Sequence, residues 1–138
     1  MLIRILLVDD HSFVRDALRE VFDETQDIRV VGECQDGTQV VPTAARTQPD
    51  VVLMDLSMPR MTGLEATRDL LASRPDTRVV LHSATATADT VCEAKDLGVA
   101  GYLVKGENSD DLPRMVRAVA TGRTVWSSAA ARYLRDCA

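Results

Sequence analysis

Short apolar runs alternate with amphipathic stretches along this 138-residue chain, and the alternation limits the folds that the chain can adopt. Five runs rich in Val, Ile and Leu have the length of buried β-strands: residues 3–8, 28–32, 51–55, 78–83 and 101–104. When strands and helices alternate in this way, the strands form a parallel sheet with helices on both faces. The pattern therefore predicts an α/β fold with a doubly wound, five-stranded parallel sheet.

Each predicted strand is followed by a stretch with apolar residues at helical spacing. We expect helices over residues 14–22, 39–47, 64–73, 90–97 and 109–120, and a further short helix over residues 127–135. Gly98 suits a left-handed C-cap. Ser109 suits an N-cap, with Asp110 and Asp111 in the first turn. Pro113 would fall at about the fourth helical position and should cost a hydrogen bond.

Polar side chains stand at the carboxyl ends of four predicted strands. They are Asp9 and Asp10 after the first strand, Asp55 after the third, Ser83 after the fourth and Lys105 after the fifth. Parallel strands end at one edge of the sheet, and ligands bind there, at the point where the strand order reverses. Carboxylates, a hydroxyl and an ammonium group at one point predict a site for a divalent cation and a phosphoryl group.

The charges of this cluster need a partner. Two carboxylates about 4 Å apart repel each other by roughly 4 kcal/mol at an effective dielectric constant near 20. A proton, a cation or Lys105 must relieve this repulsion. Mg²⁺ suits the cluster because it takes oxygen ligands and typically uses one or two carboxylates together with phosphate. Asp10 by itself could be a simple helix N-cap, but a site explains the five side chains better.

The composition, 46% hydrophobic and 27% charged, is that of an ordinary globular domain. A net charge of −5 disfavours DNA binding by this chain unaided. The sequence has no apolar run near the roughly 20 residues that span a bilayer and no signal-peptide pattern, so we expect a cytoplasmic protein without membrane contact. Cys34, Cys92 and Cys137 have no metal-binding spacing, and we expect them to be reduced thiols that pack in the interior.

Four motifs carry a family resemblance. They are Leu7-Val8-Asp9-Asp10-His11, Asp55-Leu56-Ser57-Met58-Pro59-Arg60-Met61-Thr62-Gly63, Ser83-Ala84 and Gly101-Tyr102-Leu103-Val104-Lys105. Through these motifs the chain resembles the receiver domain of two-component response regulators, with residues 1–122 as the domain. The Asp-Asp-His opening and residues 119–123 resemble the NarL/FixJ subfamily, whose members end in a LuxR-type helix-turn-helix. The resemblance implies a flavodoxin-like (βα)5 fold with strand order 2-1-3-4-5.

The resemblance also implies the chemistry of the site. Asp55 would accept a phosphoryl group from the phosphohistidine of a sensor histidine kinase. Mg²⁺ would be held by Asp10, Asp55 and the backbone carbonyl of Ser57, and Asp9 would bind it directly or through water. The domain would catalyse only its own phosphorylation and dephosphorylation, so we do not expect a conventional enzyme.

Three residues would turn phosphorylation into a conformational change in the manner of the family. Lys105 would pair with the phosphoryl oxygens, Ser83 would hydrogen-bond to the phosphoryl group, and Tyr102 would turn into the space that Ser83 leaves. The change would control homodimerisation, through either the fourth and fifth helices or the first and fifth, and thereby transcription.

Two features depart from the family pattern. Many receiver domains have Pro after the site lysine, whereas this chain has Gly106, so we expect a more mobile loop there. The chain also ends at Ala138, before any helix-turn-helix. Residues 123–138 would be a linker or extra helix toward an absent DNA-binding domain, and we favour a piece of a longer regulator over a stand-alone receiver.

Other readings of the chain are disfavoured. A phosphatase with an Asp nucleophile would carry a second Asp where Ser57 stands, and a flavodoxin would have a glycine- and hydroxyl-rich first loop. A degenerate receiver that only docks partners would lack part of the site. We expect His11 in a surface loop, with a position near the metal as the alternative, and His82 in a packing or solvent-exposed position.

Overall fold

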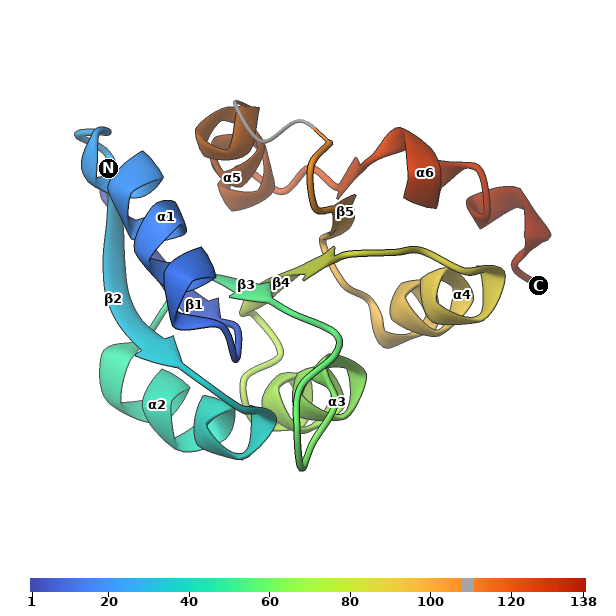
Figure 1. The fold of residues 1–138 in the computed structure, drawn as a ribbon, viewed down its shortest axis with the longest axis horizontal. Coiled ribbons are helices and arrows are strands. Elements are labelled where there is room, and N and C mark those ends of the chain that lie inside the picture. The colour runs from blue at the N-terminus through green and yellow to red at the C-terminus, as the bar shows by residue number, and fades with distance from the viewer. Residues whose placement is uncertain (108–110) are drawn as a thin grey trace.

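The computed structural model describes residues 1–107 and 111–138, and a parallel sheet lies at its centre (Figure 1). The strands are β1 (Ile3–Val8), β2 (Ile28–Cys34), β3 (Val51–Met54), β4 (Arg78–Ser83), β5 (Gly101–Val104) and β6 (Val125–Trp126). Their order is β2-β1-β3-β4-β5-β6, and all neighbouring pairs are parallel. The predicted flavodoxin-like α/β fold and strand order 2-1-3-4-5 are confirmed, and a sixth strand extends the sheet beside β5.

The helices follow the predicted pattern closely. They are α1 (Ser12–Asp23), α2 (Val40–Thr47), α3 (Gly63–Ser73), α4 (Ala88–Leu97), α5 (Leu112–Ala120) and α6 (Ser128–Ala131), with 3-10 turns at Gly37–Gln39 and Leu134–Asp136. Thr87 and Thr90 form a capping box that starts α4 two residues before its predicted beginning. Gly98 ends α4 with φ of 83°, the predicted left-handed cap. None of the described helices is long and apolar enough to cross a membrane.

The start of α5 differs from the prediction. The predicted N-cap Ser109 and the first-turn Asp110 lie outside the described residues. Asp111 is the N-cap residue of the helix as described, and its side chain makes no capping hydrogen bond. Pro113 is the second residue of α5, not the fourth. Because the N–H groups of the first turn have no partner within the helix, Pro113 costs no helical hydrogen bond, and the predicted penalty was wrong.

Different helices cover the two faces of the sheet. α1 and α5 pack on the face that carries Ile5 and Leu7, whereas α2, α3 and α4 pack on the face that carries Leu6 and Val8 (Figure 1). These four side chains are at most 2% exposed. A strand buried on both faces reads as a continuous apolar run, which is why β1 is apolar at nearly every position.

Residues after α5 fold back onto β5. Tyr102 pairs with Trp126 in parallel register, and Ser127, which is 1% exposed, accepts a hydrogen bond from the N–H of Val104 (3.2 Å). The helix predicted over residues 127–135 is present as α6 and the 3-10 turn that follows it. β6, only two residues long, was not predicted. The role of residues 123–138 as a linker stays a prediction.

A disulfide joins Cys92 in α4 to Cys137, across 45 residues of sequence, with the Cα atoms 5.2 Å apart. Cys34 is free and 1% exposed. The prediction of reduced packing thiols therefore agrees with Cys34 and was wrong for the other two. The spacing of the cysteines could not reveal the pair, because it forms only where the turn at Leu134–Asp136 packs against α4.

Candidate functional site

The carboxyl ends of β1, β3, β4 and β5 meet at one edge of the sheet. The backbone N–H of Asp55 donates to the carbonyl of Val8 (2.9 Å), which places Asp55 beside Asp9. On the other side, the N–H of Lys105 donates to the carbonyl of Ser83 (2.7 Å). The hydrogen bonds of the sheet thus continue one residue beyond the strands. They hold these side chains together at the carboxyl edge of the sheet.

Four of these strand-end residues form an acidic cluster. One ligand atom each of Asp9, Asp10, His11 and Asp55 lies within 4.8 Å of the others. Asp9 and Asp55 are only 2% and 4% exposed, whereas the Asp10 side chain is 27% exposed. His11 Nδ1 lies 3.3 Å from Asp9 Oδ1 and 3.0 Å from Asp10 Oδ1, and its side chain is 54% exposed. His11 therefore lies at the surface, as expected, and also against the carboxylates.

Lys105 supplies the positive charge of the cluster. Its Nζ donates to Asp9 Oδ2 at 2.9 Å and lies 3.4 Å from Asp55 Oδ1. Burial opposes the charge of Lys105, but the hydrogen bond to Asp9 and the attraction of Asp55 outweigh it and raise the pKa of the amine. Burial, reinforced by the charge of Asp9, raises the pKa of Asp55. Asp9 and Asp55 share this one ammonium group and Asp10 lies beside them, so the site retains excess negative charge.

One oxygen of the cluster is left without a hydrogen bond. Asp10 Oδ1 is buried and accepts none from the described residues, although His11 Nδ1 lies 3.0 Å away. Such an oxygen calls for a further partner. Carboxylate oxygens are the ligands that Mg²⁺ prefers, so Asp10 and Asp55 fit a divalent cation. Ser57, whose carbonyl was predicted as another ligand, lies in the loop after β3.

The predicted switch residues line a cavity of about 320 Å³ next to the cluster. Ser83 is 5% exposed, and its Oγ accepts from the N–H of Thr85 at 3.4 Å. Tyr102 is fully buried, so its ring points inward in this structure. Its hydroxyl donates to the carbonyl of Thr85 at 2.8 Å and lies 3.0 Å from Thr90 Oγ1. Sequence reasoning missed Thr90, which ties the Tyr102 hydroxyl to α4.

Gly106 has a φ of 91°, in the left-handed region. Pro, whose ring holds φ near −65°, cannot adopt this conformation. The backbone conformation at position 106 is therefore compatible with Gly and incompatible with the Pro of the family pattern. The greater mobility expected of this loop stays a prediction.

A separate apolar hollow of about 310 Å³ adjoins Lys105 between α1 and α5. Phe13, 70% exposed, and His82 line it. Burial, together with the charge of Lys105, lowers the pKa of His82 to about 4, so its ring is neutral at pH 7. His82 thus packs against the site, in line with the packing role expected of it.

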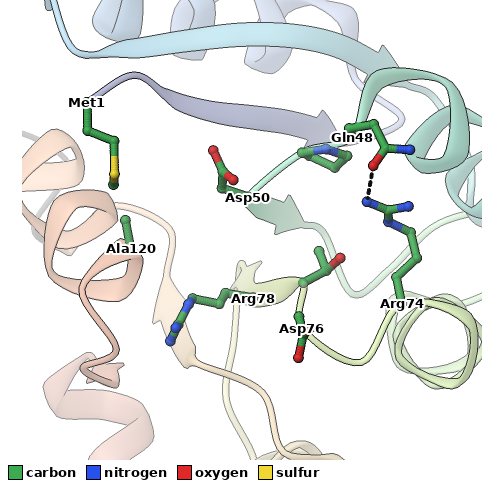
Figure 2. Close-up of a pocket in the computed structure, with 9 residues that line it drawn as sticks. Met1, Gln48, Asp50, Arg74, Asp76, Arg78 and Ala120 are labelled. Atoms are coloured by element: carbon green, nitrogen blue, oxygen red, sulfur yellow. Dashed lines mark hydrogen bonds between the residues drawn. The ribbon is translucent and has the colours of Figure 1, made fainter.

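A larger hollow, of about 530 Å³, lies at the opposite edge of the sheet, where β3 and β4 begin (Figure 2). The charged residues that line it have both signs: Asp50 and Asp76, with Arg74 and Arg78. Arg74 donates a hydrogen bond to the side chain of Gln48 at 2.9 Å. The charges that line this hollow are equal in number, whereas the acidic cluster has an excess of one sign, so the acidic cluster is the better candidate.

The fold and the site define a class: doubly wound α/β domains with a lysine-paired carboxylate cluster at the strand ends. Residues 5–117 match the family model of the response regulator receiver domain. The chain belongs to this family, whose members act in signalling. The family resemblance inferred from the sequence motifs is confirmed.

The sequence is similar to longer regulators. It is 36% identical over 129 residues to the transcriptional regulatory protein YxjL of Bacillus subtilis (strain 168), covering 94% of this chain and 59% of that protein. It is 38% identical over 140 residues to the response regulator GacA of Pseudomonas viridiflava, covering 96% and 62%. The chain thus spans about three fifths of the length of these curated relatives.

Solved structures give the same picture. A two-component response regulator of the LuxR family from Aurantimonas sp. SI85-9A1 has a TM-score of 0.92 at 29% identity, with 99% of this chain and 97% of that chain covered. The signal receiver domain of NarL from Mycobacterium tuberculosis has a TM-score of 0.83 at 30% identity, with 88% and 98% covered. These neighbours agree with the NarL/FixJ resemblance of the sequence.

Proposed function

We propose that this chain is a phosphorylation-dependent switch and that Asp55 accepts a phosphoryl group from the phosphohistidine of a sensor histidine kinase. The observation that carries the proposal is the buried Asp55 carboxylate, 3.4 Å from the Lys105 ammonium group, in a cluster with excess negative charge. A carboxylate oxygen of Asp55 attacks phosphorus, the P–N bond breaks, and the histidine ring leaves. The product is an acyl phosphate on Asp55.

The remaining residues position charge, which is the main requirement of phosphoryl transfer. Asp10, Asp55 and the Ser57 carbonyl would hold Mg²⁺, and Asp9 would bind it directly or through water; the bound ion would supply positive charge for the phosphoryl oxygens. Lys105 contacts the same oxygens from its position 2.9 Å from Asp9.

Ser83 then turns toward the phosphoryl group, and the side chain of Tyr102 moves into the space that Ser83 leaves. A hydrogen bond to a charged group contributes about 1.5–3 kcal/mol. A shift of a two-state equilibrium from 1:99 to 99:1 requires about 5.5 kcal/mol. The Ser83 hydrogen bond alone is therefore insufficient, and Lys105 pairing together with a second copy of the chain supplies the rest.

The output that we propose is transcriptional control in the cytoplasm, by homodimerisation of a longer regulator whose effector domain binds DNA. The name of the relative YxjL as a transcriptional regulatory protein supports this output. The net charge of −5 assigns DNA contact to that effector domain and not to this one.

The decisive experiment is incubation with Mg²⁺ and a small-molecule phosphodonor such as acetyl phosphate, followed by intact-mass measurement. We expect a gain of one phosphate that hydroxylamine removes and that Asp55→Asn abolishes. Asp76→Asn is the matched control, because it removes a carboxylate at the opposite edge of the sheet, and it should be phosphorylated like the parent. An unphosphorylated parent would refute the proposal, and turnover of a soluble phosphoester would favour a phosphatase instead.

A further inference from the structure

The Cys92–Cys137 disulfide joins two parts of the molecule that the phosphorylation chemistry does not use. Both of its cysteines are partly exposed. The third cysteine, Cys34, is 1% exposed, and burial raises its thiol pKa. Thiolate is the reactive form of cysteine, so the buried Cys34 should react more slowly than the partly exposed Cys92 and Cys137.

The disulfide fastens the C-terminal segment, residues 127–138, to α4. Apart from the disulfide, two regions hold this segment. Its start is fixed on β5 by the buried Ser127 and Ala130, and its end is held against α4 by the turn at Leu134–Asp136 and by the partly buried Tyr133. Its helix α6 has four residues and the following 3-10 turn has three. Helices this short are not stable by themselves in water, so their order depends on their attachment.

The same segment contacts the predicted switch residue. The N–H of Ser127 donates to the carbonyl of Tyr102 at 3.0 Å. On the other side, Thr90 of α4 lies 3.0 Å from the Tyr102 hydroxyl. Cys92 is two residues from Thr90 on α4, and Cys137 is the second-last residue of the segment that begins at Ser127. The disulfide therefore joins the two elements that enclose Tyr102.

We propose that Cys92 and Cys137 form a reversible thiol–disulfide latch that holds residues 127–138 over α4 and β5 and restrains Tyr102. The oxidant is a low-molecular-weight disulfide. One cysteine thiolate attacks it to form a mixed disulfide and releases one small thiol; the second cysteine attacks that mixed disulfide and releases another. In total, two protein thiols and one small disulfide become one protein disulfide and two small thiols.

The latch adds a second input to the domain. Reduction frees residues 127–138 to separate from α4, so Ser127 no longer holds the Tyr102 carbonyl or the Val104 N–H. Oxidation restores the enclosed arrangement. The latch itself needs no phosphoryl group; only its effect on the response of Tyr102 to phosphorylation rests on the proposed function.

Thiol counting and hydrogen exchange, without any phosphodonor, test the latch. The protein is equilibrated with oxidised or reduced glutathione, denatured, alkylated and weighed, and amide exchange is followed by mass spectrometry. We expect one alkylated thiol in the oxidised protein and three in the reduced protein. Exchange of residues 127–138 and of Val104 should be at least tenfold faster after reduction, whereas exchange in α1 should not change.

Single substitutions provide the controls. Cys92→Ser and Cys137→Ser should show the fast exchange under both redox conditions. Cys34→Ala, which leaves the pair intact, should respond to glutathione like the parent. Three alkylated thiols in the oxidised parent would overturn the proposal, and so would equal exchange of residues 127–138 in the two redox states. Because no phosphodonor is present, these outcomes do not depend on whether Asp55 is phosphorylated.

Discussion

The two ends of the sheet balance their charges differently. At the amino ends, Asp50 accepts a hydrogen bond from the N–H of Arg4 (2.8 Å) and Arg74 donates one to Gln48 (2.9 Å), although Arg74 Nε has no partner among the described residues. Charges of both signs nevertheless line this end in equal number, Asp50 and Asp76 with Arg74 and Arg78. At the carboxyl ends, Lys105 contacts Asp9 and Asp55 only, and the neighbouring Asp10 has one oxygen without a hydrogen bond from the described residues. The amino end has the larger hollow, yet the carboxyl end has the unbalanced charge. Unbalanced charge is therefore the better guide to the site than volume.

Of the substitutions that compare the two ends of the sheet, removal of Lys105 should cause the largest loss of folding stability. Lys105→Met leaves Asp9 and Asp55 buried without their cation, which should cost about 3 kcal/mol of folding stability. Urea unfolding at pH 7 without divalent ions measures the loss. The matched change at the amino end, Arg78→Met, should cost less than about 0.5 kcal/mol. Equal losses in the two variants would contradict the contrast between the two ends.

The pH dependence of stability should report His82, which packs beside Lys105. The pKa of His82 is lowered from 6.5 to about 4 in the folded protein. Between these pH values, His82 is therefore protonated more in the unfolded chain than in the folded protein. Stability should therefore fall as the pH decreases from 6.5 to 4, by at most about 3 kcal/mol from this group.

His82→Asn removes this contribution and should flatten the decline, as measured by urea unfolding at several pH values. His11→Asn, at a side chain that is 54% exposed, should keep most of the decline. A decline of the same size in His82→Asn and in the parent would show that the burial of His82 is not its cause.

Divalent cations should stabilise only the carboxyl end. At a Mg²⁺ concentration ten times the dissociation constant, binding should add about 1.4 kcal/mol, seen as a rise in Tm. Asp10→Asn should abolish the rise, and in metal-free buffer it should be more stable than the parent by about 1 kcal/mol, because a like charge is removed. Asp76→Asn should behave like the parent, and loss of the Mg²⁺ response in that variant would argue against binding at the acidic cluster.

The smallest effect is expected at Asp50. Asp50→Asn keeps an oxygen that can accept from the N–H of Arg4, so the stability should change by less than about 0.5 kcal/mol. Urea unfolding at pH 7 measures the change. A loss above 1 kcal/mol would mean that the amino end also depends on a specific charge.

The fold and the site core were predictable because both depend on local patterns. Apolar periodicity located the strands, and parallel strands necessarily bring Asp9, Asp55 and Lys105 to one edge. The structure added three features that local patterns do not contain. β6 has only two residues, too few for a periodic signal. The Cys92–Cys137 pair spans 45 residues, and the contact of Thr90 with Tyr102 depends on tertiary packing.

The disulfide also determines how the domain carries mechanical load. In the oxidised protein, a pull on Ala138 passes through Cys137 directly to Cys92 and into α4. The short β6 and its pairing with β5 then carry little of the force. In the reduced protein, the same pull would first detach the turn at Leu134–Asp136 and then peel Trp126 from Tyr102. The redox state therefore sets where a tethered neighbour can exert force on this domain: on a helix of ten residues or on a strand of two.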